Sequence, residues 1–300
     1  MSLSKNKTLF KKGDIPWNNG KGTIIVQCKT CDKAFSLRRN GRLSGRGKFC
    51  SMVCRGNYKY RAAENFKITP NMAELIGVII GDGCIDNSWS NKGCYRIFIS
   101  GNPIEDKPYM EHYLPQLIKK RLKKELKPFM GSNGAYLLQF SCEPFRLFLE
   151  KLGIGPNKTK IVKIPQEIKD KNILLRRCIR GIADTDFTVI GANHGKKKNV
   201  YPRIESQFAS EALVRDLEES LRKMGFTLNT MYNRLNKDKR GHTWISSSIN
   251  LEGPHNLNRW LKKIDFANLR LITRYQYLQK FGYLPPKTTL PQRLEDLKNG

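Results

Sequence analysis

Two short apolar stretches that each end in an aspartate constrain this sequence more than any other feature. They are Leu75–Gly83 (LIGVIIGDG) and Ile179–Phe187 (IRGIADTDF). Aligned, they match at three pairs of positions 104 residues apart: Gly77 with Gly181, Gly81 with Thr185, and Asp82 with Asp186. One apolar helix that ends on a carboxylate is ordinary. Two of them in register predict a duplicated domain with one site shared between the copies.

The charge balance points to a polyanionic partner. Lys and Arg number 55 against 26 Asp and Glu, which gives a net charge of +29. Such an excess favours binding to nucleic acid. An anionic membrane is the alternative, but no apolar run approaches the ~20 residues of a membrane span, and the N-terminus lacks a signal-peptide pattern. We therefore expect a protein with no membrane partner, located inside the cell, in the cytoplasm or in an organellar matrix if an organelle encodes it.

The order helix, hairpin, helix, hairpin, helix occurs twice along the chain. The first copy begins with Thr69 as N-cap and Pro70 at the first helical position. We predict α+β architecture: two pseudo-symmetric αββαββα repeats whose two antiparallel sheets form a saddle, plus a small N-terminal zinc module. The predicted segments are a basic arm at 1–24, a finger at 25–60, repeats at 69–168 and 169–285, and a tail at 286–300.

The predicted strands alternate between an apolar and a polar face. In the second repeat, Ile204 and Phe208 should point inward, as should Ile245 and Ile249 on a later strand. A strand surface that presents polar side chains can enter a DNA major groove, while lysines at hairpin tips contact phosphates. The expected DNA-binding residues of the repeats are Arg96, Gln139, Lys196, Lys197, Arg203, Gln207, Lys239 and Arg240.

Four cysteines near the N-terminus have the spacing of a zinc finger. They form two close pairs: Cys28 with Cys31, and Cys50 with Cys54. Two such pairs can place four thiolates around one tetrahedral Zn²⁺, as in treble-clef fingers. Two disulfides are the alternative, which a reducing compartment disfavours. The basic loop between the pairs, with Arg38 and Arg39, is expected to contact DNA phosphates.

With these features together, the chain resembles the LAGLIDADG homing endonucleases in their single-chain, two-repeat form, over about residues 69–285. The resemblance implies that the two motif helices pack side by side and that their terminal acids hold divalent metal over the minor groove. It implies cleavage of both strands within a long DNA site, with short 3′ overhangs. It assigns Asp82 and Asp186 as catalytic, metal-binding acids.

The physical chemistry of the motifs agrees with this resemblance. Ala73, Gly77 and Gly81 are spaced by four and form a small-residue stripe that lets two helices approach closely. Helix ends carry unpaired carbonyl groups and partial negative charge. With the two aspartates, the carbonyls of Gly81 and Thr185 would offer oxygen ligands to Mg²⁺, or to Mn²⁺ or Ca²⁺. The alternative is that Asp82 and Asp186 merely end exposed helices.

Each motif departs from the family pattern at one position. Phe187 stands where glycine is usual, and a phenylalanine there would be strained if the position required positive φ. Ile80 replaces the first acidic position, whereas Asp184 retains it in a supporting place. Family members also carry a basic residue near the metal. Lys158 is the candidate and Arg270 a weaker one, with phosphate contact or a linker role as the alternative.

These features predict a monomeric, site-specific DNA endonuclease that depends on divalent metal. Two other functions stay open on the same fold: an RNA-binding maturase that acts on intron RNA, and a DNA-binding regulator without catalysis. Retention of both aspartates favours cleavage. If the gene is an intron or an insertion, its joined flanking DNA would give the target sequence.

Overall fold

The computed structural model describes residues 22–38, 47–87, 95–132, 134–194, 197–285 and 287–299. The chain divides into two compact units, Met1–Asn65 and Phe66–Gly300. No described helix is both long enough and apolar enough to cross a membrane.

The described part of the first unit is a hairpin followed by a helix. Strands β1 (Thr23–Gln27) and β2 (Ala34–Arg38) pair antiparallel. Helix α2 (Met52–Glu64) begins after Ser51, whose hydroxyl accepts a hydrogen bond from the Cys54 N–H and so caps the helix. The second cysteine pair therefore lies at a helix start, as the spacing predicted.

The second unit begins with the first repeat. It consists of α3 (Pro70–Ile80), β3 (Gly83–Asp86), β4 (Arg96–Gly101), a π-helical turn (Tyr109–Tyr113) that continues into α4 (Leu114–Leu122), β5 (Phe129–Met130), β6 (Tyr136–Phe140) and α5 (Glu143–Lys151). Thr69 caps α3 by accepting from the Met72 N–H, with Pro70 in the first turn. The sheet order is β3-β4-β6-β5.

The second repeat copies this arrangement. It consists of α7 (Asn172–Asp186), β7 (Thr188–His194), β8 (Lys197–Phe208), α8 (Glu211–Lys223), β9 (Asn229–Lys237), β10 (Thr243–Glu252) and α9 (Pro254–Lys263). Its sheet order, β7-β8-β10-β9, matches the first sheet strand for strand. The α+β fold with two αββαββα repeats is thus confirmed.

Shorter elements link the repeats and follow them. A 3₁₀ turn (Lys158–Lys160) and α6 (Gln166–Lys169) lie between the repeats, and α10 (Leu269–Phe281) and α11 (Leu290–Asn299) come after the second. The C-terminal residues had suggested a tail. Instead they contain α11, which packs on α10 and buries Leu290 and the whole side chain of Arg293.

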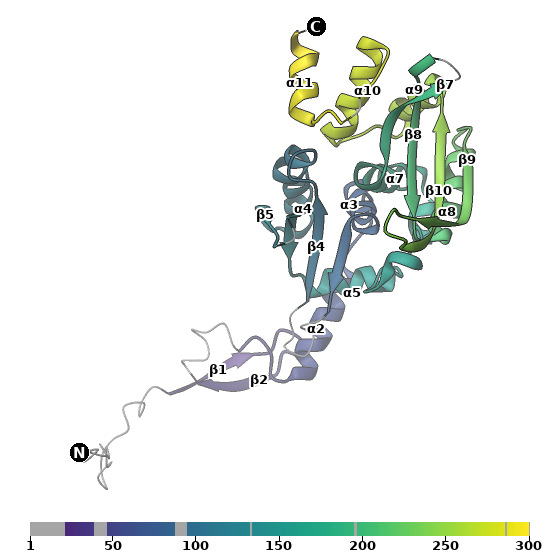
Figure 1. Ribbon diagram of the computed structural model, residues 1–300. Coiled ribbons are helices and arrows are strands. Elements are labelled where there is room, and N and C mark those ends of the chain that lie inside the picture. Colours follow the sequence, from purple (N-terminus) through teal and green to yellow (C-terminus); the bar gives the residue numbers. More distant parts are fainter. Residues whose placement is uncertain are drawn as a thin grey trace, which may run out of the picture. The chain divides into compact units, whose positions relative to one another are not determined.

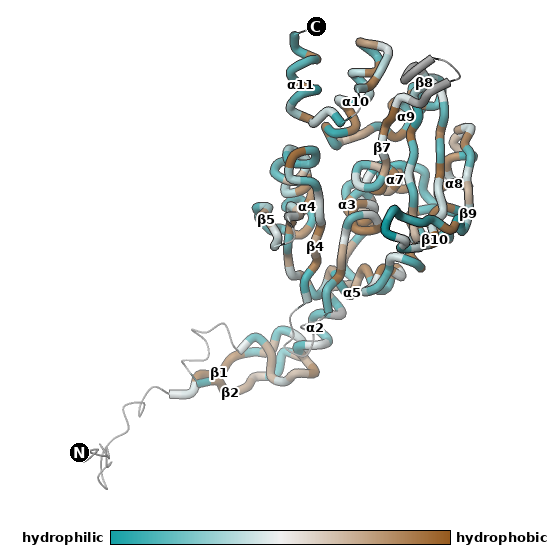
Figure 2. The backbone as a smooth tube through the Cα atoms, viewed as in Figure 1, coloured by the Kyte–Doolittle hydropathy of each residue, from teal (hydrophilic) through white to brown (hydrophobic). Residues whose placement is uncertain are grey.

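The motif helices form the centre of this unit. Figure 1 shows α3 and α7 between the two sheets, and α3 is among the most apolar segments in Figure 2. Ile97 and Ile99 of the first sheet are buried, as are Ile204 and Phe208 of the second, which the sequence predicted to point inward. These side chains fix each sheet to its helices through apolar burial.

One predicted strand face is wrong. Ile249 points inward and is fully buried, but Ile245 on the same strand is 58% exposed, and Ser246 and Ser247 are buried in its place. The register between β10 and β9 shifts between Ser246 and Ser248. Across the shift β9 advances three residues, from Met231 to Arg234, while β10 advances two, so the bulge lies in β9. A bulge disrupts the ladder and increases the local twist, so the regular alternation of β10 does not continue past it to Ile245.

Candidate active site

Helices α3 and α7 touch backbone to backbone. A Cβ atom on Gly77 would lie 2.1 Å from the carbonyl oxygen of Cys178, and one on Gly181 would lie 2.2 Å from that of Glu74. No side chain fits at either position. The predicted small-residue contact is therefore present, and it brings the C-terminal ends of the two helices together.

The two aspartates lie where these helix ends meet. A Cβ on Gly81 would lie 2.0 Å from Oδ2 of Asp186 and 2.1 Å from the Thr185 hydroxyl, so the residue before Asp82 contacts the second motif directly. Asp82 and Asp186 line one cavity of about 340 Å³ together with Gly81 and Lys158. The Thr185 hydroxyl donates to Oδ2 of Asp186 at 2.7 Å. The aspartates are not merely exposed helix ends.

Two basic side chains bind the ends of the two helices at equivalent carbonyls. Lys158 Nζ donates to the carbonyl oxygens of Ile80, at 2.5 Å, and Gly81, at 3.1 Å. Arg270 Nη2 donates to those of Asp184 and Thr185, both at 3.1 Å. Asp184 and Thr185 follow Ile80 and Gly81 by the same 104 positions that separate the motifs. Arg270, the weaker candidate from the sequence, thus occupies the place that corresponds to Lys158.

Two of the carbonyls that accept these hydrogen bonds are predicted metal ligands. The carbonyls of Gly81 and Thr185 each accept one hydrogen bond from a basic side chain. A carbonyl oxygen has two lone pairs, so each keeps one for a further partner. The residues expected to hold a divalent ion are therefore gathered at one place.

Burial and mutual repulsion perturb the acids. Burial, with added repulsion from Asp186 and Asp106, raises the pKa of Asp82 to about 7. Burial also raises the pKa of Asp186, opposed by the Thr185 hydrogen bond, Lys158 and Arg270. The pKa of Lys158 is lowered by burial, although both aspartates act in the opposite direction. Two carboxylates so placed resist joint ionisation, which a divalent cation would relieve.

Asp184 supports the fold around the site. Its buried carboxylate accepts hydrogen bonds from the backbone N–H groups of Ala267, at 2.9 Å, and Asn268, at 3.0 Å, just before α10. Burial raises its pKa to about 7 even though these bonds oppose the shift. Asp184 thereby fixes the segment that carries Arg270.

Phe187 is not strained. Its φ is −85°, in the extended region, and the ring is fully buried against Phe208 and Trp260. The expectation of a costly positive φ does not apply. The two motifs end differently, since α3 stops at Ile80 whereas α7 continues to Asp186, two residues beyond the equivalent point.

No family model matches the chain. An alignment of 219 positions that covers 65% of the chain shows 28% identity to the replication factor C small subunit of Methanocaldococcus jannaschii, but the chain spans only 11% of that protein's length.

Similar solved structures include homing endonucleases. I-DmoI in complex with DNA and Mn has a TM-score of 0.46 and 14% identity, over 66% of this chain and 98% of that one. The LAGLIDADG meganuclease I-AabMI bound to uncleaved DNA has a TM-score of 0.40 and 14% identity, over 77% of this chain and 98% of that one.

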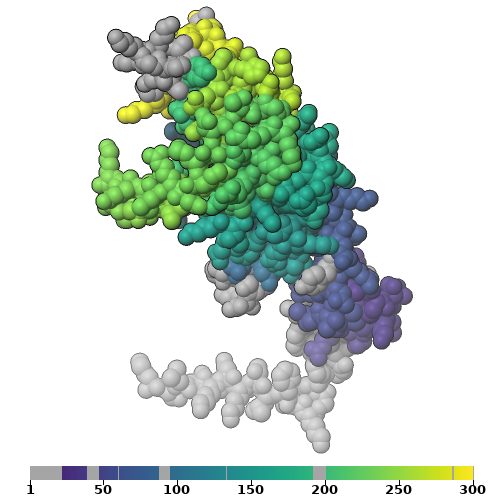
Figure 3. All heavy atoms as spheres, turned by 90° about the vertical axis from the view of Figure 1, so that its right-hand side faces the viewer, coloured from purple at the N-terminus to yellow at the C-terminus, as the bar shows by residue number. Residues whose placement is uncertain are grey.

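The expected DNA-binding side chains differ in exposure and in the partners that they contact. Lys239 and Arg240 are exposed in the turn between β9 and β10, a hairpin that extends from the second repeat in Figure 3, and Gln207 is exposed on β8. Arg96 pairs with Asp86 at 2.8 Å, and Arg203 lies between Glu205 and Glu252 at 3.2 and 3.6 Å. Gln139 is half-buried on β6, and Arg38 is exposed on β2 of the first unit. Arg39, Lys196 and the Lys197 side chain lie outside the described residues.

The sequence reasoning missed two sets of residues. One is the polar group beside the bulge, where Asn236 Nδ2 donates to the Ser246 hydroxyl at 2.8 Å and Gln207 Nε2 donates to Asn236 at 3.4 Å. The other is Asp106, which contacts Arg270. Asp106 lies 104 positions before Ser210, so the repeat offset itself could have drawn attention to it.

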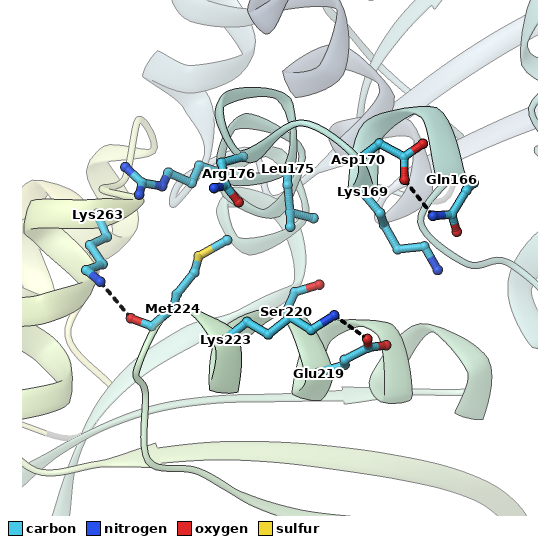
Figure 4. A pocket seen from close by; sticks show the side chains of 11 residues that line it. Gln166, Lys169, Asp170, Leu175, Arg176, Glu219, Ser220, Lys223, Met224 and Lys263 are labelled. Carbon is cyan, nitrogen blue, oxygen red and sulfur yellow. Dashed lines mark hydrogen bonds and ion pairs between the residues drawn. The ribbon is translucent and has the colours of Figure 1, made fainter.

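A separate cavity of about 350 Å³ lies away from the aspartates, among α6, α7, α8 and Lys263 of α9 (Figure 4). Its lysines have partners: Lys223 pairs with Glu219, and Lys263 donates to the Met224 carbonyl.

The four N-terminal cysteines converge in the first unit. The sulfur atoms of Cys28, Cys31, Cys50 and Cys54 lie within 4.8 Å of one another, and all four are free thiols. The sulfurs of Cys31 and Cys50 are 3.6 Å apart, and those of Cys50 and Cys54 are 3.5 Å apart. The predicted cluster is present, and its donor set suits one Zn²⁺ ion.

Proposed function

We propose that this chain is a metal-dependent, site-specific DNA endonuclease of the LAGLIDADG homing type, which hydrolyses both strands of its target. One observation carries the proposal. Asp82 and Asp186, from two copies of the same motif, line one cavity with a buried lysine where two close-packed helices end. Two acids, helix-end carbonyls and a cation suit the hydrolysis of a phosphodiester.

Asp82 and Asp186 would hold the divalent ion, with help from the carbonyls of Gly81 and Thr185. Carboxylate and carbonyl oxygens are the ligands that Mg²⁺, Mn²⁺ and Ca²⁺ prefer. When bound, such an ion supplies positive charge for the scissile phosphate and for water. The raised pKa of Asp82 fits this use, because a cation offsets the repulsion that now favours the protonated acid.

Lys158 would act on the phosphate. Its ammonium has three hydrogens, and the carbonyls of Ile80 and Gly81 accept two of them. The third can bind a phosphate oxygen in the cavity. A fixed positive charge in a partly dry site stabilises the charge that develops in the transition state more than it stabilises the substrate.

Basic and polar side chains on the strands and turns of the second unit suit the binding of double-stranded DNA. Lys239 and Arg240 can bind phosphates, which gives affinity without sequence information, while Gln139 and Gln207 can read base edges. A net charge of +29 supports binding that weakens steeply with salt. Because one chain contains both motifs, a monomer would suffice to cut both strands of a long site.

The first unit would extend this footprint as a zinc-stabilised module. The hairpin and the helix formed by its described residues offer little core, so Zn²⁺ held by the four cysteines would supply much of its folding free energy. Arg38 would then contact DNA phosphates.

The test is cleavage of a plasmid that carries the joined flanking DNA of the gene. We expect linear product with Mg²⁺ or Mn²⁺, none with EDTA, and short 3′ overhangs when the ends are sequenced. Specific binding without cutting in either ion would contradict the proposal and indicate a DNA-binding regulator. Binding to the intron RNA in preference to this duplex would indicate a maturase.

A further inference from the structure

The two basic residues at the helix ends are held in different ways. Arg270 uses four of its five N–H donors within the protein. Nε donates to Asp106 Oδ1 at 3.0 Å, Nη1 to the Phe187 carbonyl at 3.1 Å, and Nη2 to the carbonyls of Asp184 and Thr185. Its charge is matched by the Asp106 carboxylate, and both side chains are 15% exposed.

Lys158 has no such counter-charge in contact. Its ammonium donates to two neutral carbonyls, and no carboxylate of the described residues lies within 4.0 Å of it. It lines the cavity that Asp82 and Asp186 share. The positive charge and one N–H donor of Lys158 are therefore available to a ligand. The charge of Arg270 and four of its five donors are already engaged within the protein.

The difference arises from one pair of equivalent positions. Asp106 and Ser210 are 104 residues apart, and each lies where the second strand of its repeat leads into a helix. Ser210 Oγ donates to the Val162 carbonyl at 2.6 Å, in the linker that follows the first repeat and carries Lys158. Asp106 accepts from Asn268 Nδ2 at 2.7 Å and from Arg270, in the linker that follows the second. Each repeat thus holds the other's linker, one with a hydroxyl and the other with a carboxylate.

Asp106 is itself held in place. Its Oδ2 accepts from the Asn102 N–H at 2.8 Å. The preceding residue, Glu105, accepts from the Leu290 N–H at 2.7 Å and from the fully buried Arg293 at 2.6 Å. These bonds fasten the loop to α11, so Asp106 cannot readily turn away from Arg270.

We infer that Asp106 is a positioning residue that keeps Arg270 as a brace of the second motif helix and withholds its charge from phosphate, so that the two DNA strands are cut at different rates. This inference rests on the proposed endonuclease function. The strand whose scissile phosphate meets Lys158 is cut first. The strand that meets Arg270 is cut later, and a nicked duplex accumulates between the two steps.

The test is single-turnover cleavage of the joined flanking DNA, with each strand labelled separately. Both strands are cut by the same folded molecules, so the ratio of the two nicking rates does not depend on how much protein is folded. Asp106→Ser gives the first repeat the residue of the second and should speed cleavage of the slow strand by up to about fivefold, the range of one partly exposed ion pair. Ser210→Asp should slow the fast strand.

Two further variants separate positioning from stability. Asp106→Asn keeps the shape and an acceptor but removes the charge, and should shift the ratio in the same direction as Asp106→Ser. Glu105→Gln alters the neighbouring carboxylate, which does not touch Arg270, and should change the melting temperature but not the ratio. Equal rates for both strands in the unaltered protein, or an unchanged ratio of rates in both Asp106 variants, would overturn this inference but leave the proposed endonuclease function standing. No cutting by the unaltered protein would overturn the proposed function as well.

Discussion

The backbone of Gly77 lies so close to that of Cys178 that a methyl group on the glycine would be 2.1 Å from the Cys178 carbonyl oxygen. Gly77→Ala should therefore force α3 and α7 apart and lower the free energy of unfolding by about 3 kcal/mol, as overpacking of a tight contact does. Urea denaturation measures this change.

The matched control for Gly77→Ala is Gly155→Ala. A Cβ at Gly155 would meet only the Glu150 side chain, at 3.9 Å, and the residue does not need positive φ. Its unfolding free energy should change by less than about 0.5 kcal/mol. Equal effects of the two substitutions would show that the helices are not in backbone contact.

Asp82→Asn should stabilise the metal-free protein above neutral pH. Burial, Asp186 and Asp106 raise the folded-state pKa of Asp82 to about 7, whereas an unfolded aspartate titrates near 3.9. Between these values the folded state binds more protons than the unfolded state, so this carboxyl lowers stability progressively as pH rises through that window. Asparagine removes the effect, with a gain of up to about 4 kcal/mol near pH 8 and almost none near pH 4.

The measurement for Asp82 is urea denaturation in EDTA at both pH values. The exposed Glu167→Gln serves as a control for the loss of one negative charge. A stability gain that is the same at both pH values, or that Glu167→Gln reproduces, would contradict the assigned pKa.

Arg293→Met should destabilise the second unit by about 3 kcal/mol. Arg293 is fully buried and donates to Glu105, Thr273 and the Thr288 carbonyl, so its loss leaves a carboxylate without its partner. Arg222→Met breaks an exposed pair with Glu218 and should cost less than about 1 kcal/mol. Thermal melting that ranks the two the other way would show that α11 is dispensable.

Removal of zinc should unfold the first unit and leave the second intact. Cys50 and Cys54 flank the start of α2, and their sulfurs lie together with those of Cys28 and Cys31. A chelator should make residues 22–65 sensitive to protease, and Cys50→Ser together with Cys54→Ser should do the same. Native mass spectrometry gives the zinc content, and an intact, protease-resistant first unit without zinc would refute the assignment.

The repeated motifs made most of the fold predictable. The offset of 104 residues aligned Gly77 with Gly181 and Asp82 with Asp186, and alternation placed Ile204 and Ile249 in the core. These features depend on local periodicity, which the sequence displays directly.

What the sequence did not reveal depends on neighbours that are distant along the chain. The prediction that Ile245 points inward is wrong because the bulge depends on how β10 pairs with β9, which neither strand shows by itself. The expectation of strain at Phe187 is wrong because the residue is extended and its ring packs against Trp260 and Phe208. Asp106 went unnoticed because its partner, Arg270, is 164 positions away.

If Asp82 and Asp186 form one metal-dependent cutting site, loss of both carboxylates should abolish cleavage. The most direct measurement is cleavage of the joined flanking DNA in Mg²⁺ by the variant that carries both Asp82→Asn and Asp186→Asn, with DNA binding followed in parallel. Neither strand should be cut while specific binding persists, because the contacts to DNA lie mainly on other residues. Cutting of the same site by this variant at the unaltered rate would contradict this prediction.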